Sequence, residues 1–152
     1  GAIKFYLLRV RANQDIHFDP EESISFDGFT GPYCQYACAR ISGILRNATE
    51  LGFSRKDIDY GVLGNEEELL LIRHLIQFPE ELEISAAELS PSRLAVHVFN
   101  TAKAFNQFYN KHQVIRAESE NLAKARLALI NACRVALKTG LNLLGIDVLE
   151  RM

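Results

Sequence analysis

The chain lacks several features by which common classes of protein are identified from sequence. No apolar run approaches the length of a membrane-spanning helix, and no basic-then-apolar start suggests a signal peptide. It contains no glycine-rich phosphate loop, no paired-histidine motif, and no serine or cysteine beside a plausible general base. These absences argue against a membrane partner and against catalysis by this chain alone.

Cysteine is scarce and has no paired-motif spacing. The three cysteines are an odd number, which fits a reducing compartment such as the cytoplasm better than a disulfide framework. Cys34 and Cys38 are four residues apart on a predicted helix, but no nearby His or Cys completes a four-ligand metal set. We therefore expect buried thiols and no metal site. His97, also on a predicted helix, is interpreted as a packing residue with its hydrogen bonds satisfied.

Charge is distributed unevenly, although the net charge of −2 is small. Residues 101–152 carry eight Lys and Arg against four acids, whereas the first hundred residues carry nine bases and fifteen acids. This asymmetry is expected of a protein with a nucleic-acid contact surface, and it is also common by chance in a domain of this size. The candidate phosphate contacts are Lys103, Lys111, Lys124, Arg126, Arg134 and Lys138.

The hydrophobic periodicity predicts an all-α helical bundle of about five or six helices in a chain long enough for one core. We expect helices over residues 1–11, 32–48, 66–78, 80–88, 91–112 and 119–139, with Pro79 ending the third and Gly140 acting as a left-handed stop after the last. Ser90 and Pro91 form a clear helix start. Residues 12–31 and 51–65 are predicted to be loops.

A polar-aromatic face is predicted near the start of the second of these helices. Tyr33, Tyr36 and Arg40 recur at three- and four-residue steps, so they share one side of the helix. Two phenols and a guanidinium can stack on bases and bind phosphate. The same spacing also fits half-buried tyrosines with a solvated arginine, and spacing alone leaves both interpretations open.

The sequence resembles arginyl-tRNA synthetases, which belong to class I of the aminoacyl-tRNA synthetases. The resemblance is carried by residues 26–33 (FDGFTGPY), Gln35-Tyr36-Ala37, Ala39-Arg40, Phe108-Tyr109, Gly145-Ile146 and Glu150-Arg151-Met152, with residues 1–8 and 18–23 fitting the same family. It covers almost the whole chain and places it at the C-terminal anticodon-binding domain. The chain also starts abruptly without Met, so we expect a piece of a longer protein.

The resemblance implies a domain division and a set of partners. Residues 1–31 would be the end of the connector from the catalytic domain and an entry loop, and residues 32–152 the helical anticodon-binding domain. The expected partners are tRNA-Arg and the chain's own catalytic domain, without DNA. The parent enzyme would attach arginine to tRNA using ATP and Mg, with its nucleotide-binding motifs upstream, so this fragment should need no cofactor and should be inactive.

The predicted tRNA-binding residues extend beyond the helix face of Tyr33, Tyr36 and Arg40. Tyr109 offers a ring, Asn110 a base-edge hydrogen bond and Lys111 a phosphate contact, and the resemblance adds the chain end, Arg151 and Met152. We expect Leu143, Leu144 and Ile146 to dock this tail on the bundle. Two alternatives stay open: a helical protein-interaction module without RNA affinity, and the anticodon domain of a cysteinyl-tRNA synthetase.

Overall fold

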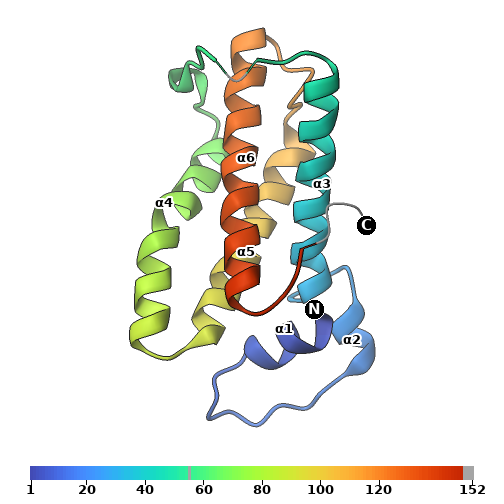
Figure 1. Ribbon diagram of the computed structural model, residues 1–152, viewed down its shortest axis with the longest axis vertical. Helices are drawn as coiled ribbons and strands as arrows, with labels where there is room; N and C mark the ends of the chain where they lie inside the picture. Colours follow the sequence, from blue (N-terminus) through green and yellow to red (C-terminus); the bar gives the residue numbers. More distant parts are fainter. Residues whose placement is uncertain (55, 149–152) are drawn as a thin grey trace.

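Four long helices make up most of the protein (Figure 1). They are α3 (Gly31–Glu50), α4 (Glu66–Ala87), α5 (Pro91–Lys111) and α6 (Glu120–Leu143); two short helices, α1 (Ala2–Leu8) and α2 (Pro20–Ile24), precede them, and a 3₁₀ turn, η1 (Tyr60–Val62), lies before α4. The computed structural model describes residues 1–54 and 56–148, and within these residues there is no strand. The predicted all-α bundle is confirmed.

The core lies between the long helices, with α5 in contact with α1, α3, α4 and α6. Apolar residues at helical spacing on each element face this centre. The largest fully buried apolar side chains come from five helices: Phe5, Ile41, Leu71, Val98, Phe105, Phe108, Ile130, Leu137 and Leu141. Ile146, just beyond α6, is buried with them. α3 begins at Gly31, one residue before the predicted start, and the Thr30 hydroxyl oxygen caps it by accepting a hydrogen bond from the Tyr33 N–H at 3.2 Å.

The predicted break at Pro79 is wrong, because α4 continues through this residue to Ala87. Proline removes a helical hydrogen bond and normally ends or kinks a helix. Here α5 contacts α4 on both sides of Pro79: the His74 carbonyl lies 3.1 Å from His97 Nε2, and Glu81 pairs with Arg93 at 2.7 Å. Figure 1 shows α4 bending along its length while remaining one helix.

The predicted left-handed stop at Gly140 is also wrong. Gly140 lies inside α6, and a Cβ atom there would collide with Val98 Cγ2 of α5. The left-handed residue is Gly145, with φ of 70°, which ends the helix in the usual glycine C-cap geometry. Its N–H donates to the Asn142 carbonyl at 2.9 Å, and the next N–H donates to the Leu141 carbonyl at 2.9 Å. Gly140 is therefore needed for close helix packing.

The predicted loop over residues 12–31 contains helix α2, which the sequence interpretation missed. The Asp19 carboxylate accepts hydrogen bonds from the N–H groups of Glu21 and Glu22, at 2.9 and 3.1 Å, and Pro20 occupies the first turn. An Asp followed by Pro is a helix start as well as a turn signal. Asp19-Pro20 was interpreted as a turn because the helix that follows is only five residues long.

Arg126 is buried in an ion pair, which removes it from the six candidate phosphate contacts. Its Nε donates to Glu68 Oε1 at 2.7 Å and its Nη1 to the Gln113 carbonyl at 2.8 Å. The other Glu68 oxygen accepts from the N–H groups of Gly64 and Asn65, which joins the pair to the α4 N-terminus. Burial alone would raise the pKa of Glu68, but the Asn65 N–H, Arg126 and the Gly64 N–H together hold that pKa below its usual value.

Two predictions about reactive side chains are confirmed by burial. All three cysteines are free and buried, and burial raises the pKa of each thiol, that of Cys38 to about 12. His97 is a packed residue between α4 and α5. Among residues 1–54 and 56–148, no cluster of three or more His, Cys, Asp or Glu side chains could hold a metal ion. No helix in the same residues has the length and apolarity needed to span a bilayer.

Removing the carboxylate of Glu68 should destabilise the fold strongly, because it leaves the Arg126 charge buried without its partner. We expect Glu68→Ala to lower the free energy of unfolding by about 3–5 kcal/mol. Glu66→Ala, in the exposed first turn of the same helix, is the matched control and should cost at most about 1 kcal/mol. Urea denaturation followed by circular dichroism measures both, and equal losses would contradict the assignment.

Adding one methyl group at Gly140 should also destabilise the protein, because α5 leaves no room for it. Gly140→Ala is expected to lower the free energy of unfolding by about 1–3 kcal/mol. The same substitution at Gly43 of α3 is the control, since an ideal Cβ there has its nearest neighbour 3.9 Å away. Gly43→Ala should stabilise the helix by about 0.5–1 kcal/mol, and thermal melts that shift both variants in the same direction would contradict this prediction.

Candidate nucleic-acid interface

Arg40 of α3 contacts two tyrosine rings that come from different helices. Its guanidinium carbon is 4.7 Å from the centre of the Tyr36 ring and 5.2 Å from that of Tyr109 on α5. Its Nη2 also donates a hydrogen bond to the Tyr36 hydroxyl at 2.9 Å. Cation–π contact and this hydrogen bond together fix the orientation of the two rings.

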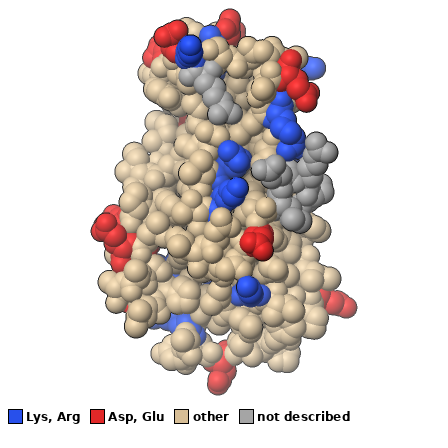
Figure 2. Space-filling model, viewed as in Figure 1, with Lys and Arg blue, Asp and Glu red and all other residues tan. Residues whose placement is uncertain are grey.

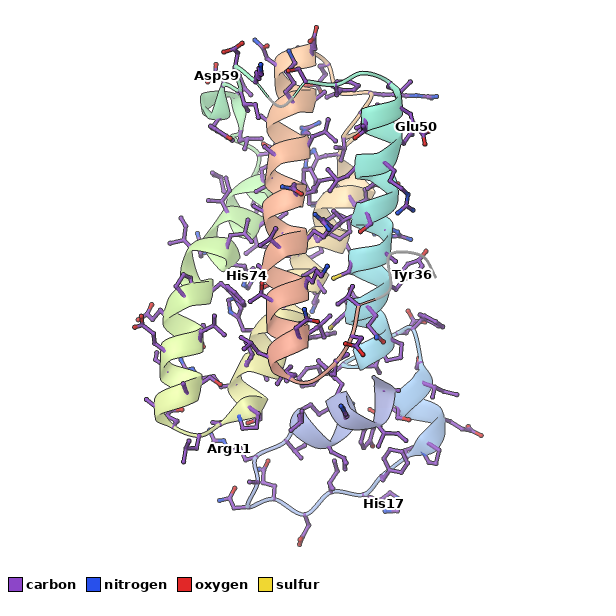
Figure 3. The ribbon with its side chains drawn as sticks, in the orientation of Figure 1. Arg11, His17, Tyr36, Glu50, Asp59 and His74 are labelled. Carbon is purple, nitrogen blue, oxygen red and sulfur yellow. The ribbon has the colours of Figure 1, made fainter. Side chains whose placement is uncertain are left out.

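Both tyrosines remain accessible although Arg40 restrains them. Tyr36 and Tyr109 are each 38% exposed, which leaves part of each ring free. Tyr36 lies one turn before Arg40, and Figure 3 shows it at the side of α3 that faces outward from the bundle. Tyr109 is held from the inner side by Phe105, whose ring lies stacked at 5.9 Å. Tyr36 and Tyr109 therefore present two rings that contact the Arg40 guanidinium and remain partly accessible to solvent.

Tyr33 is placed differently from its predicted partners. Its ring packs against Phe99 of α5 at 5.3 Å, and Phe99 in turn contacts Phe29 at 4.7 Å. Tyr33 is half-buried in this aromatic group. The structure therefore joins Tyr36, Arg40 and Tyr109, while it gives Tyr33 a supporting position at the start of α3.

Asn110 and Lys111 lie toward α4, at the end of α5. Both line an open groove of about 380 Å³ together with Glu67 at the α4 N-terminus. The Lys111 ammonium is paired with the Glu67 carboxylate, whose second oxygen lies 2.8 Å from His112 Nε2. The hydrogen bond from Lys111 holds the pKa of Glu67 at about 2, and Glu67 raises the pKa of Lys111. Lys111 is thus an exposed cation with an acidic neighbour, and Asn110 beside it is exposed.

Two further residues belong to the site and were missed in the sequence. Asn106 lies one turn before Tyr109 on α5, and its Oδ1 is 3.5 Å from Arg40 Nη1. The three-residue step from Tyr109 was a signal that could have identified it. Phe26, from the segment before α3, meets the Tyr36 ring edge-on at 6.0 Å and is itself exposed. The turn before α3 separates Phe26 from Tyr36, so no helical periodicity predicts their contact.

The remaining basic residues do not form one uniform surface. Lys103 and Lys138 are exposed, Lys124 pairs with Glu120 at 2.7 Å, and Arg134 donates to Asn131 at 3.4 Å. Figure 2 shows one face of the molecule, on which the Lys and Arg atoms of the described residues form separate groups. Exposed candidates for phosphate contact therefore remain, but they are dispersed.

The predicted tail docking is confirmed for Leu144 and Ile146, which are buried, and wrong for Leu143, which is 62% exposed. The described tail then runs along α3, where Gln35 Nε2 donates to the Asp147 carbonyl at 2.6 Å. Arg151 and Met152 lie outside the described residues. Their predicted role stays a prediction.

Chemically, this surface suits unpaired nucleic-acid bases. Exposed tyrosine rings offer planes for base stacking, hydroxyl and amide groups offer hydrogen bonds to base edges, and Lys111, two residues after Tyr109, offers a contact to phosphate.

Comparison with known proteins agrees with this geometry. The family model described as "DALR anticodon binding domain" matches residues 34–152. An arginine–tRNA ligase of Clostridium kluyveri is 43% identical over the whole chain, which covers 27% of that protein, and one of Clostridium botulinum is 40% identical, with 26% covered. The chain spans about a quarter of the length of these curated relatives.

Solved structures show the same similarity. The Thermus thermophilus arginyl-tRNA synthetase superposes with a TM-score of 0.91 and 34% identity, over all of this chain and 26% of that one. The Plasmodium falciparum arginyl-tRNA synthetase gives a TM-score of 0.84 at 25% identity, over 99% of this chain and 26% of that one. The chain therefore belongs to the DALR anticodon-binding domain family and corresponds to the anticodon-binding part of arginyl-tRNA synthetases.

Proposed function

We propose that this chain binds the anticodon region of tRNA-Arg through the surface of Tyr36, Arg40 and Tyr109. The observation that carries the proposal is the Arg40 guanidinium in contact with two partly exposed tyrosine rings, one from α3 and one from α5. Rings that are already oriented lose less conformational freedom when a base stacks on them. Anticodon bases are unpaired, so they can leave their own stack and contact such rings.

Each of the other predicted residues has a different role in this proposal. Tyr33 packs on Phe99 and offers the accessible part of its ring at the start of the same helix, Asn110 donates or accepts at a base edge, and Lys111 contacts phosphate while it stays paired with Glu67. Arg151 and Met152 complete the site from the chain end. The phosphate attraction comes from exposed lysines such as Lys103 and Lys138.

In the full-length protein, this binding would serve the attachment of arginine to tRNA. The relatives that the chain matches are arginine–tRNA ligases, and the chain covers about a quarter of each. We infer a parent enzyme of the cytoplasm that uses ATP and Mg on a catalytic domain outside residues 1–152. Residues 1–31 would connect that domain to the anticodon-binding domain of residues 32–152. The relatives' names favour the arginyl over the cysteinyl alternative.

Removing the Tyr36 ring should weaken tRNA binding while it preserves the fold. Loss of a stacked base costs about 1–3 kcal/mol, so Tyr36→Ala should raise the dissociation constant for tRNA-Arg roughly ten- to a hundredfold. Tyr60→Ala removes an exposed ring of η1, away from the site, and is the matched control. Fluorescence titration at fixed salt measures both variants against tRNA-Arg and a tRNA with a mismatched anticodon.

An equal effect of the two tyrosine variants, or equal affinity of the unaltered chain for both tRNAs, would contradict the proposed function. A protein-interaction module without RNA affinity would bind neither tRNA. Circular dichroism of each variant confirms that helix content is kept.

Deleting Arg151 and Met152 should reduce tRNA charging in the full-length enzyme without changing arginine activation. The tail is anchored on the bundle by Leu144 and Ile146, and an anchored tail loses less conformational freedom when it binds RNA. ATP–pyrophosphate exchange measures activation, and aminoacylation at varied tRNA concentration measures the second step. An unchanged KM for tRNA-Arg would show that the last two residues do not contribute.

A further inference from the structure

Arg9, the residue after α1, joins this helix to α2 and to the segment before α3 (Figure 1). Its Nη1 donates a hydrogen bond to the Phe29 carbonyl at 2.8 Å, and its Nη2 pairs with Glu22 Oε1 of α2 at 2.8 Å. Its guanidinium carbon also lies 3.8 Å from the centre of the Tyr6 ring. A guanidinium can make all three contacts at once, because its planar fork carries several N–H donors and its face stacks on aromatic rings.

The acidic partner of Arg9 is fixed in the same way. The Tyr6 hydroxyl lies 2.9 Å from Glu22 Oε2, and it accepts a hydrogen bond from the Asp19 N–H at 3.3 Å. The Arg9 guanidinium, and after it the Tyr6 hydroxyl, hold the pKa of Glu22 below its usual value. Both terminal nitrogens of Arg9 are occupied within the protein and its side chain is only 13% exposed, so it is a structural cation and not a phosphate contact.

The Phe29 carbonyl belongs to a tight turn of residues 25–30, here called the entry turn. The Thr30 hydroxyl donates to the Ser25 carbonyl at 2.6 Å, and the Thr30 N–H donates to the Gly28 carbonyl at 3.0 Å. Gly28 has φ of 83°, a conformation that suits glycine. The entry turn is therefore closed by its own hydrogen bonds, and the bond at the Phe29 carbonyl ties it to the end of α1.

The entry turn reaches the proposed tRNA site through Phe26. The Phe26 ring, which is 54% exposed, meets the Tyr36 ring edge-on at 6.0 Å, so Tyr36 is restrained by Phe26 as well as by Arg40. We propose that Arg9 and Glu22 are positioning residues for tRNA binding, which hold the entry turn so that Phe26 keeps the Tyr36 ring oriented for a base. The inference rests on the proposed function and adds two residues that contribute to affinity without touching the RNA.

The acidic member of the pair gives the sharper test, because charge alone predicts the opposite result. Removing a negative charge favours RNA binding by itself. Glu22→Ala should nevertheless weaken tRNA-Arg binding about three- to tenfold, since the Tyr36 ring is less well oriented before the base arrives. Glu21→Ala removes the same charge from the exposed neighbour in α2 and is the matched control, which should leave the affinity unchanged or raise it.

The basic member is tested by Arg9→Met, with Arg11→Met as the matched loss of an exposed charge two residues further on. Arg9→Met should also weaken binding about three- to tenfold, while the slope of log affinity against log salt stays unchanged. Loss of a direct phosphate contact would instead reduce the size of that slope by about 0.7. The Phe29 ring still packs against Phe5 in this variant, so we expect the fold to be kept.

A double-mutant cycle tests whether the pair acts through the entry turn. In a chain that already carries Phe26→Ala, neither Glu22→Ala nor Arg9→Met should have a further effect on tRNA affinity. Arg11→Met should have the same effect in both chains. Circular dichroism and melting temperatures of all variants separate lost affinity from lost folding, and if Arg9→Met loses helix content, the Glu22→Ala cycle decides.

The outcomes distinguish this inference from the proposed function. Effects that add to that of Phe26→Ala, a Glu22→Ala variant that behaves like Glu21→Ala, or a reduced salt slope in Arg9→Met overturn the positioning role. If Tyr36→Ala loses affinity while Glu22→Ala does not, the inference fails and the proposed function stands. If Tyr36→Ala also has no effect, both fail.

Discussion

The burial of α5 among α1, α3, α4 and α6 is the constraint on which the rest of the structure depends. Its apolar face supplies Val98, Phe105 and Phe108 to the core, and these side chains determine how closely the neighbouring helices approach. α6 lies so close to α5 at position 140 that only a glycine fits there. The contacts of α5 with α4 hold that helix together across Pro79.

The candidate site follows from the same packing. Tyr109 projects from α5 and Arg40 from α3, and the two meet because the buried faces of these helices are pressed together. Phe105 supports the Tyr109 ring from inside, so the surface pair is an extension of the core. The buried pair of Glu68 and Arg126 has a structural role instead, because it joins the start of α4 to α6 and to the segment after α5. Arg126 thus stabilises the fold, whereas Arg40 orients the surface rings.

Several elements were predictable from local patterns in the sequence. The start of α3 follows from the Thr30 cap and the start of α5 from Pro91 in its first turn, because these signals act within a few residues; Ser90 lies at the N-cap position of α5 without a side-chain cap hydrogen bond. The helices of the bundle and its apolar faces follow from periodicity. The family resemblance, carried in part by residues 26–40, predicted Tyr36, Arg40 and Tyr109 as site residues. The comparisons with known proteins agree with this resemblance.

Contacts between distant segments were decided only by the tertiary structure. Pro79 and Gly140 are helix breakers by local rules, yet both lie inside helices because contacts with α5 outweigh the local preference. Arg126 has the sequence pattern of a surface base, but its partner Glu68 is 58 residues away. The sequence by itself determined most of the long helices, the starts of α3 and α5 and the residue types of the site. The pairing of α3 with α5, the ion pair and the anchoring of the tail required the folded chain, because each joins groups that no local spacing relates.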